Sequence, residues 1–488
     1  MIACARRRGG RVAAGVSTVT AGEIALPSTA RSASLFVLFA LCLAGCSMPA
    51  PKPPAPTLTM PGTWRTNVGP GAPVEQGWWQ AFHDPELNAI VTRALANNND
   101  IRIAQSRLQE YQARLRIAHS AQSPTLTASA GPTRARVINA FGQPAEATVF
   151  AGSVQAAYEI DVWGRLAATT EAARADLESQ QGLADATALS VAASAASSYL
   201  NLRGLDAQLD LARATLQSRE QSLKLARRQF EVGYSSRLEL SQAEAEYRAT
   251  AAVVPQLERA IAQQENTLSI LLGANPGPIP RGAALTALTA PAITPGLPSD
   301  LLRRRPDIRQ AERAVVAADR NLAAARDQLL PSLRLTGSVG VQAYSISQLL
   351  HSPVQLWSIG GSVLAPLFDA GRLRAQAAIA GTVRDRAIYG YEGVVRNAFA
   401  EVDNALVSVQ RLREQLDEAI ARERAAAEVL RIAHNRYANG YASYLEELDA
   451  QRNHFSAQTS VLQLRASLLA AHVDLYRALG GGWTTPVR

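Results

Sequence analysis

The sequence has little of what most catalytic and metal-binding sites need. Only three of its 488 residues are cysteine, and Cys4 and Cys42 lie in a segment that we expect to be removed. The six histidines show no pairing with cysteine or carboxylates at the spacing of a metal site. Serine and aspartate form no nucleophile and base arrangement. The sequence therefore predicts no disulfide framework, no metal site and no enzyme activity.

Aromatic residues are also scarce, at 6%, and no charge of one sign dominates. The net charge of +8 falls to +4 when the first 45 residues are set aside, because 44 basic and 40 acidic residues remain. These charges are interleaved along helical segments, as on solvated helix faces, so we expect no nucleic-acid partner. An aromatic-poor, alanine-rich composition favours closely packed helices.

The apolar run Leu35–Leu43 is too short to span a bilayer as a helix. Five arginines precede this run, and it ends in Leu43-Ala44-Gly45-Cys46, which follows the pattern of a bacterial lipobox. Residues 1–45 are therefore predicted to be a lipoprotein signal peptide. Cleavage would leave Cys46 carrying diacylglycerol and palmitate, with no other cofactor, followed by a Pro-rich tether over 46–77. Ser47 favours sorting to the outer membrane. The alternative is an ordinary signal peptide with an incidental cysteine.

The sequence repeats itself at a fixed offset. Gly233-Tyr234 recurs 207 residues later as Gly440-Tyr441. The same offset relates Asp100-Ile101-Arg102 to Asp307-Ile308-Arg309, Gly164-Arg165-Leu166 to Gly371-Arg372-Leu373, and Leu272-Gly273 to Leu479-Gly480. An offset kept without a gap over this length indicates two copies of one unit. We predict copies at 78–274 and 300–480, a Pro/Gly-rich linker at 275–299 and a tail at 481–488.

Each copy has the same predicted order of parts. The parts are a first helix at 98–122 or 305–329, a β-hairpin at 124–161 or 331–369, a long helix at 164–232 or 371–439, and a return helix at 235–272 or 442–479. The long helix, of about 68 residues, would be roughly 100 Å long. The shorter helices, of about 25 and 38 residues, can then stack end to end along it. Residues 78–97, the linker and the tail would gather near its middle.

Two periodicities distinguish helices from strands. Apolar residues at seven-residue intervals predict a coiled-coil seam in the long helices: Leu202, Leu209, Leu216, Leu223 and Phe230 in the first copy, and Val409, Leu416, Leu430 and Tyr437 in the second, with Glu423 as the exception. Alternation predicts strands with one apolar face: Leu333–Tyr344, the positions Phe150, Val154, Ala156, Tyr158 and Ile160, and the positions Trp357, Ile359, Val363 and Ala365.

Four strands per chain, each near the ~9 to 11 residues that cross a bilayer, cannot close an outer-membrane barrel, because the smallest bacterial barrels have about eight. Open sheet edges are not tolerated in lipid. If the strands are transmembrane, several chains must share one barrel. The alternative is a small soluble sheet on a helical rod. Export, a lipid anchor and apolar strand faces favour the membrane.

Several segments together resemble the TolC-type outer-membrane efflux family, and more narrowly its lipoprotein branch, which partners resistance-nodulation-division pumps. They are Trp78-Trp79 through Asp84-Pro85, Gly296–Arg309, the two Gly-Arg helix starts and the turn Arg436-Tyr437-x-x-Gly440. The resemblance implies an α+β, mainly α fold: a homotrimer with a twelve-stranded β-barrel in the outer membrane and a twelve-helix coiled-coil tunnel in the periplasm. It also implies a periplasmic adaptor, an inner-membrane pump and outer-membrane lipid as partners. The function would be passive conduction of drugs or other small toxic solutes through an end that opens like an iris.

The Gly-Tyr turns would lie roughly 100 Å from the strands, at the periplasmic end of the tunnel. Gly233 and Gly440 supply the positive φ of a tight turn between helices. In the family these turns contact the adaptor, which assigns a docking role to Gly233, Tyr234, Ser235 and Ser236 and to Gly440, Tyr441, Ala442 and Ser443. The alternative is that they are only turns.

Carboxylates begin both return helices. Glu446 and Asp449 share a face because they are three residues apart, and three-fold symmetry would make each a ring that favours cations. In the family, the residues matching these two line the closed constriction, and the one matching Glu239 helps to hold neighbouring helices together. Some relatives carry a basic tether where this chain has Ala442. Its candidate replacements are Tyr437 and Arg436; the alternative role of the carboxylates is to stabilise helix dipoles.

Two other functions stay open. The chain could be the outer-membrane conduit of a type I protein-secretion system, or a non-conducting coiled-coil lipoprotein that acts as a spacer. Ion conductance would separate a channel from a spacer. Methionine occurs after the signal segment only as Met48 and Met60, so a methionine-lined metal path in this subunit has no support.

Overall fold

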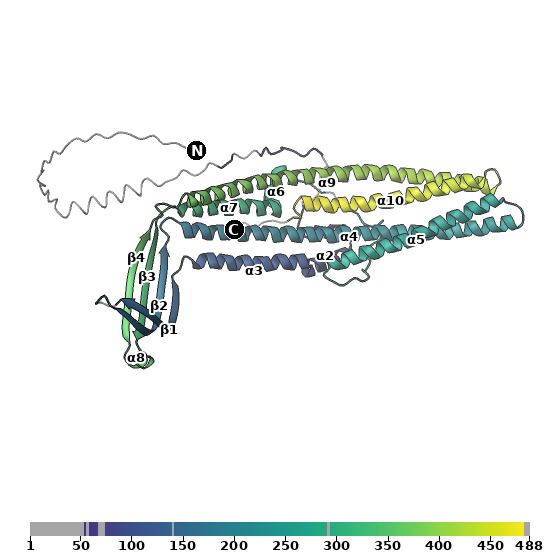
Figure 1. Ribbon diagram of the computed structural model, residues 1–488. Coiled ribbons are helices and arrows are strands. Elements are labelled where there is room, and N and C mark those ends of the chain that lie inside the picture. The colour runs from purple at the N-terminus through teal and green to yellow at the C-terminus, as the bar shows by residue number, and fades with distance from the viewer. Residues whose placement is uncertain (1–52, 55–57, 67–73, 139–140, 290–292, 483–488) are drawn as a thin grey trace, which may run out of the picture. The chain divides into compact units, whose positions relative to one another are not determined.

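The computed structural model describes residues 53–54, 58–66, 74–138, 141–289 and 293–482 (Figure 1). Residues 1–45, Cys46 and much of the tether lie outside this described part of the chain. The described residues all belong to the unit Pro53–Arg488.

Each copy contains the three helices and two strands in the predicted order. The first copy has α3 (Asn99–Ser120), β1 (Thr125–Ile138), β2 (Pro144–Ile160), α4 (Arg165–Glu231) and α5 (Arg237–Leu271), and the second has α7 (Pro306–Asp327), β3 (Ser332–Ala343), β4 (Val354–Leu364), α9 (Arg372–Ala438) and α10 (Tyr444–Ala478). The short elements are η1 (Trp78–Phe82), α2 (Pro85–Asn97), η2 (Pro298–Asp300), α6 (Leu301–Arg304) and α8 (Ile346–His351). Both long helices have 67 residues and both return helices have 35. The expected α+β, mainly α fold is confirmed.

The short helices stack end to end along the long ones, as Figure 1 shows for α3 and α5 beside α4. The junction between α3 and α5 and the junction between α7 and α10 use residues at equivalent positions, but the residue types differ. The Asn98 side chain caps α3 and donates from Nδ2 to the carbonyl oxygen of Leu271, at 3.0 Å. At the equivalent positions, Arg305 Nη1 donates to the carbonyl oxygen of Ala478, at 2.8 Å. Both copies therefore have a side-chain to carbonyl hydrogen bond at this junction, with an amide donor in the first copy and a guanidinium donor in the second.

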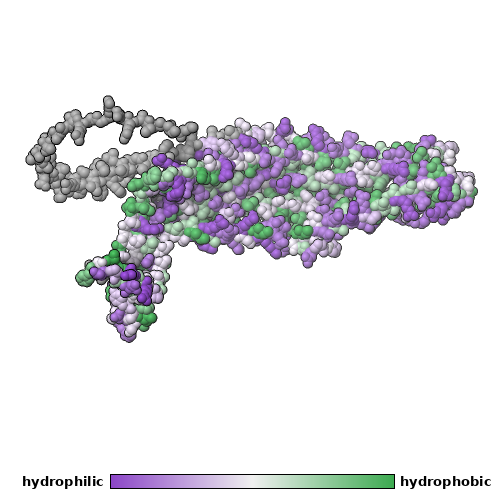
Figure 2. Space-filling model, in the orientation of Figure 1, coloured by the Kyte–Doolittle hydropathy of each residue, from purple (hydrophilic) through white to green (hydrophobic). Residues whose placement is uncertain are grey.

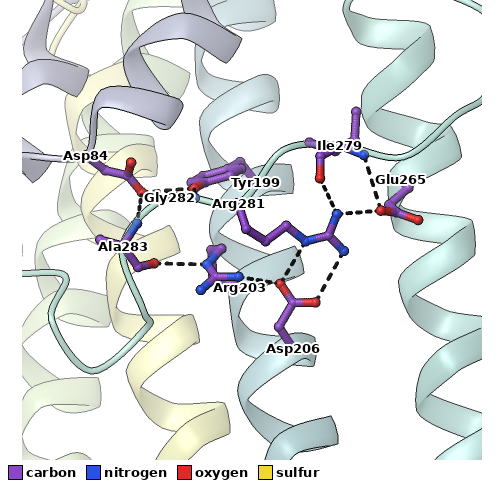
Figure 3. A network of polar contacts seen from close by, with 9 residues as sticks. All are labelled: Asp84, Tyr199, Arg203, Asp206, Glu265, Ile279, Arg281, Gly282 and Ala283. Atoms are coloured by element: carbon purple, nitrogen blue, oxygen red, sulfur yellow. Dashed lines mark hydrogen bonds and ion pairs between the residues drawn. The ribbon is translucent and has the colours of Figure 1, made fainter.

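The start of the first copy and the linker between the copies meet near the middle of α4. Trp78 stacks on Tyr476 with ring centroids 4.9 Å apart. Buried Asp84 accepts hydrogen bonds from the Tyr199 hydroxyl (2.9 Å) and from the backbone N–H of Ala283 (3.2 Å) in the linker (Figure 3). Burial raises the pKa of Tyr199 well above its ordinary value. The hydroxyl therefore stays protonated and able to donate.

A second set of charges holds the linker against α4 and α5. Arg281 lies between Asp206 of α4 and Glu265 of α5, and Arg203 also pairs with Asp206, at 2.6 Å (Figure 3). Arg203 Nε donates to the carbonyl oxygen of Ala283 (3.0 Å). These contacts fix the linker on the same two helices that continue toward the Gly-Tyr turn.

The four strands form one antiparallel sheet in the order β1-β2-β3-β4. Register places apolar residues opposite one another, because Val339 of β3 pairs with both Val154 of β2 and Trp357 of β4. Val154, Val339, Trp357 and Ile359 are all exposed in the single chain. Figure 2 shows hydrophobic residues gathered where the strands meet the helices, whereas hydrophilic residues are spread along the helices. The predicted single apolar face is present.

Three of the four strands are longer than the expected 9 to 11 residues: β1, β2 and β3 have 14, 17 and 12 residues, whereas β4 has 11. β1 and β2 continue into a polar extension in which Arg134 pairs with Glu146, at 3.3 Å. Counting apolar alternation alone therefore underestimated them. Ala365, expected in the last strand, lies just beyond the end of β4. Across the part of the chain that the structure describes, no helix has the length and hydropathy needed to cross a membrane.

Candidate functional site

The candidate site is the end of the molecule formed by two helical hairpins. We call α4 and α5 hairpin 1, and α9 and α10 hairpin 2. Gly233 and Gly440 end the long helices with φ of +77° and +76°. The backbone N–H of Tyr234 bonds to the carbonyl of Gln229 (2.7 Å), as that of Tyr441 does to Arg436 (2.8 Å), which is the Schellman pattern of helix termination. The two turns are therefore the same backbone structure.

Both turns present a tyrosine to solvent. The side chains of Tyr234 and Tyr441 are 89% and 78% exposed. Ser236 starts α5 and its hydroxyl accepts from the backbone N–H of Glu239 (3.2 Å), whereas Ser443 starts α10 and its carbonyl accepts from the backbone N–H of Glu446 (3.1 Å). The predicted docking residues of each turn thus lie together, at the tip of each hairpin.

The three predicted gate carboxylates do not lie on one hairpin. Glu446 and Asp449 are both exposed on α10, where Glu446 pairs with Arg436 (2.8 Å) and Asp449 accepts from the Asn453 side chain (3.0 Å). Glu239 lies in the first turn of α5. Within the single chain, only the pair on α10 shares a face.

The two candidate tethers make different contacts. Arg436 bonds Glu446 and the Tyr441 carbonyl, both in its own hairpin. The Tyr437 hydroxyl crosses to hairpin 1 and donates to Gln229 Oε1, at 3.4 Å. Burial, followed by the charges of Glu239 and Glu447, raises the pKa of Tyr437. Of the two, Tyr437 is the one whose contact joins the hairpins.

A charge cluster beneath the turns was not predicted from the sequence; its Arg219 and Glu246 are buried, whereas its Arg452 is exposed. Glu246 of α5 pairs with Arg219 of α4 (3.5 Å) and with Arg452 of α10 (2.7 Å), so one carboxylate joins both hairpins. Arg219 is only 4% exposed, and burial lowers its pKa. We call these three residues the Glu246 clamp. A signal was available, because Arg219 follows Leu216 by three residues and thus stands at a second seam position of the heptad.

An apolar cluster surrounds the clamp. Leu223 and Ala226 of α4, Ala243 of α5, and Tyr444 and Leu448 of α10 are buried together, with Tyr437 against them. Burial raises the pKa of Tyr444 to about 12. The seam predicted from heptads is therefore real here, and it includes return-helix residues that the heptads did not identify.

Hairpin 2 contains two histidine and glutamate pairs. His454 of α10 contacts Glu423 of α9 (3.2 Å), and His434 of α9 contacts buried Glu447 of α10 (2.8 Å). The heptad exception Glu423 thus has a specific partner. No group of three or more potential metal ligands occurs among the residues that the structure describes.

Comparison with known proteins identifies the class. Residues 90–274 and 297–481 match the family described as outer membrane efflux protein, and these two spans correspond to the two copies. The chain belongs to this family. Its members are channels, not enzymes, and the chain is an outer-membrane channel subunit of a tripartite efflux system with a periplasmic tunnel.

Individual relatives agree over most of the chain. The antibiotic efflux pump outer membrane protein ArpC of Pseudomonas putida is 34% identical over 456 residues, covering 91% of this chain and 94% of ArpC. The cation efflux system protein CusC of Escherichia coli is 31% identical, covering 91% and 97%. The CmeC outer membrane channel of Campylobacter jejuni superposes with a TM-score of 0.82 at 26% identity, covering 90% and 96%. These relatives are efflux components, which gives the secretion and spacer alternatives no support.

Proposed function

We propose that the two hairpin tips are the docking surface for a periplasmic adaptor. Channels of this family form trimers and work with adaptors and inner-membrane pumps. The observation that carries the proposal is the pair of equivalent turns, each with an exposed tyrosine next to small residues. Such a small, partly apolar knob fits between the helices of a partner. Three chains would present six of them in a ring.

The same end would form the gate. Glu446 and Asp449, exposed on one face of α10, would form two acidic rings in a trimer. Glu239 and Tyr437 lie near the contact between the hairpins, and we propose that they hold neighbouring helices together. Opening would be an iris-like movement of these helices, with Tyr437 and Arg436 as the tethers that replace a basic residue at Ala442.

The outer strands suggest how the trimer enters the outer membrane. β1 and β4 each pair with one strand of the chain. Because an open sheet edge is not tolerated in lipid, we propose that neighbouring copies join edge to edge. Cys46 would carry diacylglycerol and palmitate and anchor the N-terminus in the same membrane.

We propose that the cargo is a drug or another small toxic solute, delivered by a resistance-nodulation-division pump. The name of ArpC refers to antibiotics and that of CusC to cations. The scarcity of methionine noted above favours organic solutes over soft metal ions.

Replacing Gly440 or Ser443 with glutamate tests the docking role. Each change places a bulky charged side chain on the tip, so drug resistance restored by a plasmid copy in a channel-deficient host should be lost while trimers still form. Thr267→Glu, on an exposed part of α5 away from the tip, is the control that should retain resistance. Normal resistance with G440E and S443E would argue against docking at these turns.

A further inference from the structure

Glu159 and Arg334 are the charged residues of the part of the described sheet in which four strands run side by side. This part comprises Thr125–Pro132, Phe150–Ile160, Ser332–Ala343 and Val354–Leu364. Glu159 of β2 lies directly opposite Arg334 of β3, and Ser362 of β4 lies opposite Arg334 on its other side. Both charges are close to the helical body, because β2 precedes α4 and β3 follows α7.

Arg334 lies on the polar face of the sheet. Successive side chains of a strand point to opposite faces, so Arg334 faces away from the apolar residues Leu335 and Val339 of the same strand. Its own face carries hydroxyl groups, among them those of Ser338 and Ser358, which are hydrogen-bonded at 2.8 Å. In a barrel shared by three copies, the apolar face meets lipid and the polar face lines the lumen. The side chain of Arg334 would therefore project into the water of the lumen.

The charge of Arg334 is not neutralised by the residue opposite it. Its side chain is exposed, and it makes no hydrogen bond or ion pair with any residue that the structure describes. Glu159 pairs instead with Arg165 at the start of α4, at 2.6 Å, and the side chains of both residues of this pair are largely buried. The negative charge of Glu159 is thus already balanced, whereas the guanidinium of Arg334 keeps its full positive charge.

The other carboxylates near the junction of strands and helices have their own roles. Asp161 and Asp369 each accept a hydrogen bond of 2.8 Å from a backbone N–H group, at the starts of α4 and α9 respectively. They therefore stabilise the positive ends of these two helices. Burial raises the pKa of Asp327, near the end of α7, which makes its charged form less favourable. These groups do not pair with Arg334.

The first copy of the repeat has no charge at the equivalent position. A shift of 207 residues relates Arg334 to Thr127, which is exposed in β1 opposite Gln155. Gln155 in turn lies opposite Ser338, so Thr127 is on the same polar face as Arg334. Each chain would therefore contribute one arginine to the wall of the lumen, and a trimer would have three at the same height.

We propose that the Arg334 side chains of three copies form a cationic collar at the periplasmic end of the barrel lumen, and that this collar favours the passage of anionic solutes. Ionisable residues in membrane-spanning segments typically face a water-filled path, and substitutions in a barrel lumen change selectivity. Guanidinium groups attract carboxylate, sulfonate and phosphate groups. The proposal rests on the proposed function and narrows its cargo: the last part of the path favours anionic organic solutes, whereas the carboxylates at the hairpin tips would favour cations.

Charges attached to an introduced cysteine test the collar. Cys46 would be the sole cysteine left after signal removal, and its thiol would be acylated, so Arg334→Cys gives one reactive thiol per chain in the full-length trimer. This thiol is labelled in planar bilayers with a methanethiosulfonate reagent that carries either a trimethylammonium or a sulfonate group. Leu335→Cys is the matched control, because Leu335 is the next residue and lies on the apolar face. The reversal potential in a gradient of potassium chloride gives the ratio of chloride to potassium permeability.

The acidic residues at the hairpin tips could mask a collar in the barrel. The same labels are therefore also applied to Arg334→Cys in a chain that carries Glu446→Ala and Asp449→Ala, which removes the proposed acidic rings. The effect of the label should be larger in this chain, because the barrel then contributes more to the selectivity of the whole path.

We expect the permeability ratio of chloride to potassium to be about threefold higher with the positive label on R334C than with the negative one. This effect is smaller than in a narrow charged cleft because a barrel of twelve strands is wide. The difference should shrink at high salt, because the Debye length falls from about 30 Å at 0.01 M to about 3 Å at 1 M. Neither label should change the reversal potential of L335C.

The proposal is overturned if both labels on R334C give the same reversal potential at low salt. It is also overturned if L335C responds as strongly as R334C, because the polar face would then not line the lumen. If R334C does not form trimers, R334K and R334E replace it: R334K should keep the selectivity of the wild type and R334E should lose chloride permeability, and equal selectivity would overturn the proposal. A wild-type trimer that does not conduct would refute the proposed function, and the collar with it.

Discussion

Hairpins 1 and 2 have helices of equal length and turns of the same geometry, yet they differ directly beneath the turns. Hairpin 1 supplies Arg219 and Glu246 to the clamp, whereas hairpin 2 has Ala426 and Asn453 at those positions. Hairpin 2 instead contains the pairs of His454 with Glu423 and His434 with Glu447. Backbone geometry has thus been kept in both copies, while the side chains that control contacts between hairpins have diverged.

The two copies are therefore equivalent in backbone geometry but not in the side chains beneath the turns. Two identical copies would give six equivalent contacts around the mouth, and no contact would separate before another. Divergence at the clamp positions removes this equivalence, because hairpin 2 has neither the arginine nor the carboxylate of the clamp.

The largest expected effect is on the clamp. Glu246→Ala removes the carboxylate shared by Arg219 and Arg452, and breaking a buried ion pair from one side typically costs about 3 to 5 kcal/mol. The equivalent change in hairpin 2, Asn453→Ala, should cost less than about 1 kcal/mol because Asn453 is exposed. Thermal unfolding followed by circular dichroism would compare them. Equal losses would show that the clamp adds nothing specific to hairpin 1.

The junctions between stacked helices should also differ. Arg305→Ala removes charged hydrogen bonds to Asp307, Glu401 and the Ala478 carbonyl, at a cost of about 2 to 3 kcal/mol. The equivalent Asn98→Ala removes a helix cap and one hydrogen bond, at a cost of about 1 to 2 kcal/mol. Denaturant midpoints of the two variants should follow that order. The reverse order would mean that the repeat junctions do not depend on charge.

A moderate effect is expected at the mouth. Replacing Glu446 and Asp449 together with alanine would remove the two proposed acidic rings, so conductance should rise or cation preference should fall in planar bilayers. Glu239→Ala in hairpin 1 should change selectivity less, because a single carboxylate is lost there. If the double variant conducts like the wild type, these residues do not line the constriction.

The smallest effect concerns pH. His472 of α10 is 3% exposed, and burial lowers its pKa below the usual 6.5, so the folded state favours the neutral ring. The unfolded chain binds the proton more readily, and the stability due to this group is full above pH 6.5 and is lost as pH falls through the folded-state pKa. His472→Gln should therefore unfold with a smaller difference between pH 7.5 and 5.5 than the wild type. If the variant and the wild type showed the same pH dependence of stability, other titratable groups would be responsible for it.

Much of this arrangement was predictable because it depends on local and periodic features. Gly233 and Gly440 predict turns that need a positive φ. Prolines predict helix ends, and apolar residues at heptad spacing predict the coiled-coil seams. The strand lengths were underestimated because β1 and β2 extend through Arg134 and Glu146, which no apolar pattern detects. The Glu246 clamp was missed because Glu246 resembles any acidic residue on a solvated helix face.

The two copies, the order and length of their helices, the apolar face of the strands and the position of the turns could all be predicted from the sequence. These features follow from the backbone preferences of glycine and proline and from the spacing of apolar residues, which act over short stretches of chain. Which charged side chains come into contact depends instead on how the helices pack. Glu246 and Arg452 are 206 residues apart, and their contact exists because α5 and α10 are brought together by the packing of two separate hairpins. The two turn segments, Phe230–Glu239 and Tyr437–Glu446, therefore differ little in the turns themselves and strongly in the side chains just beneath them.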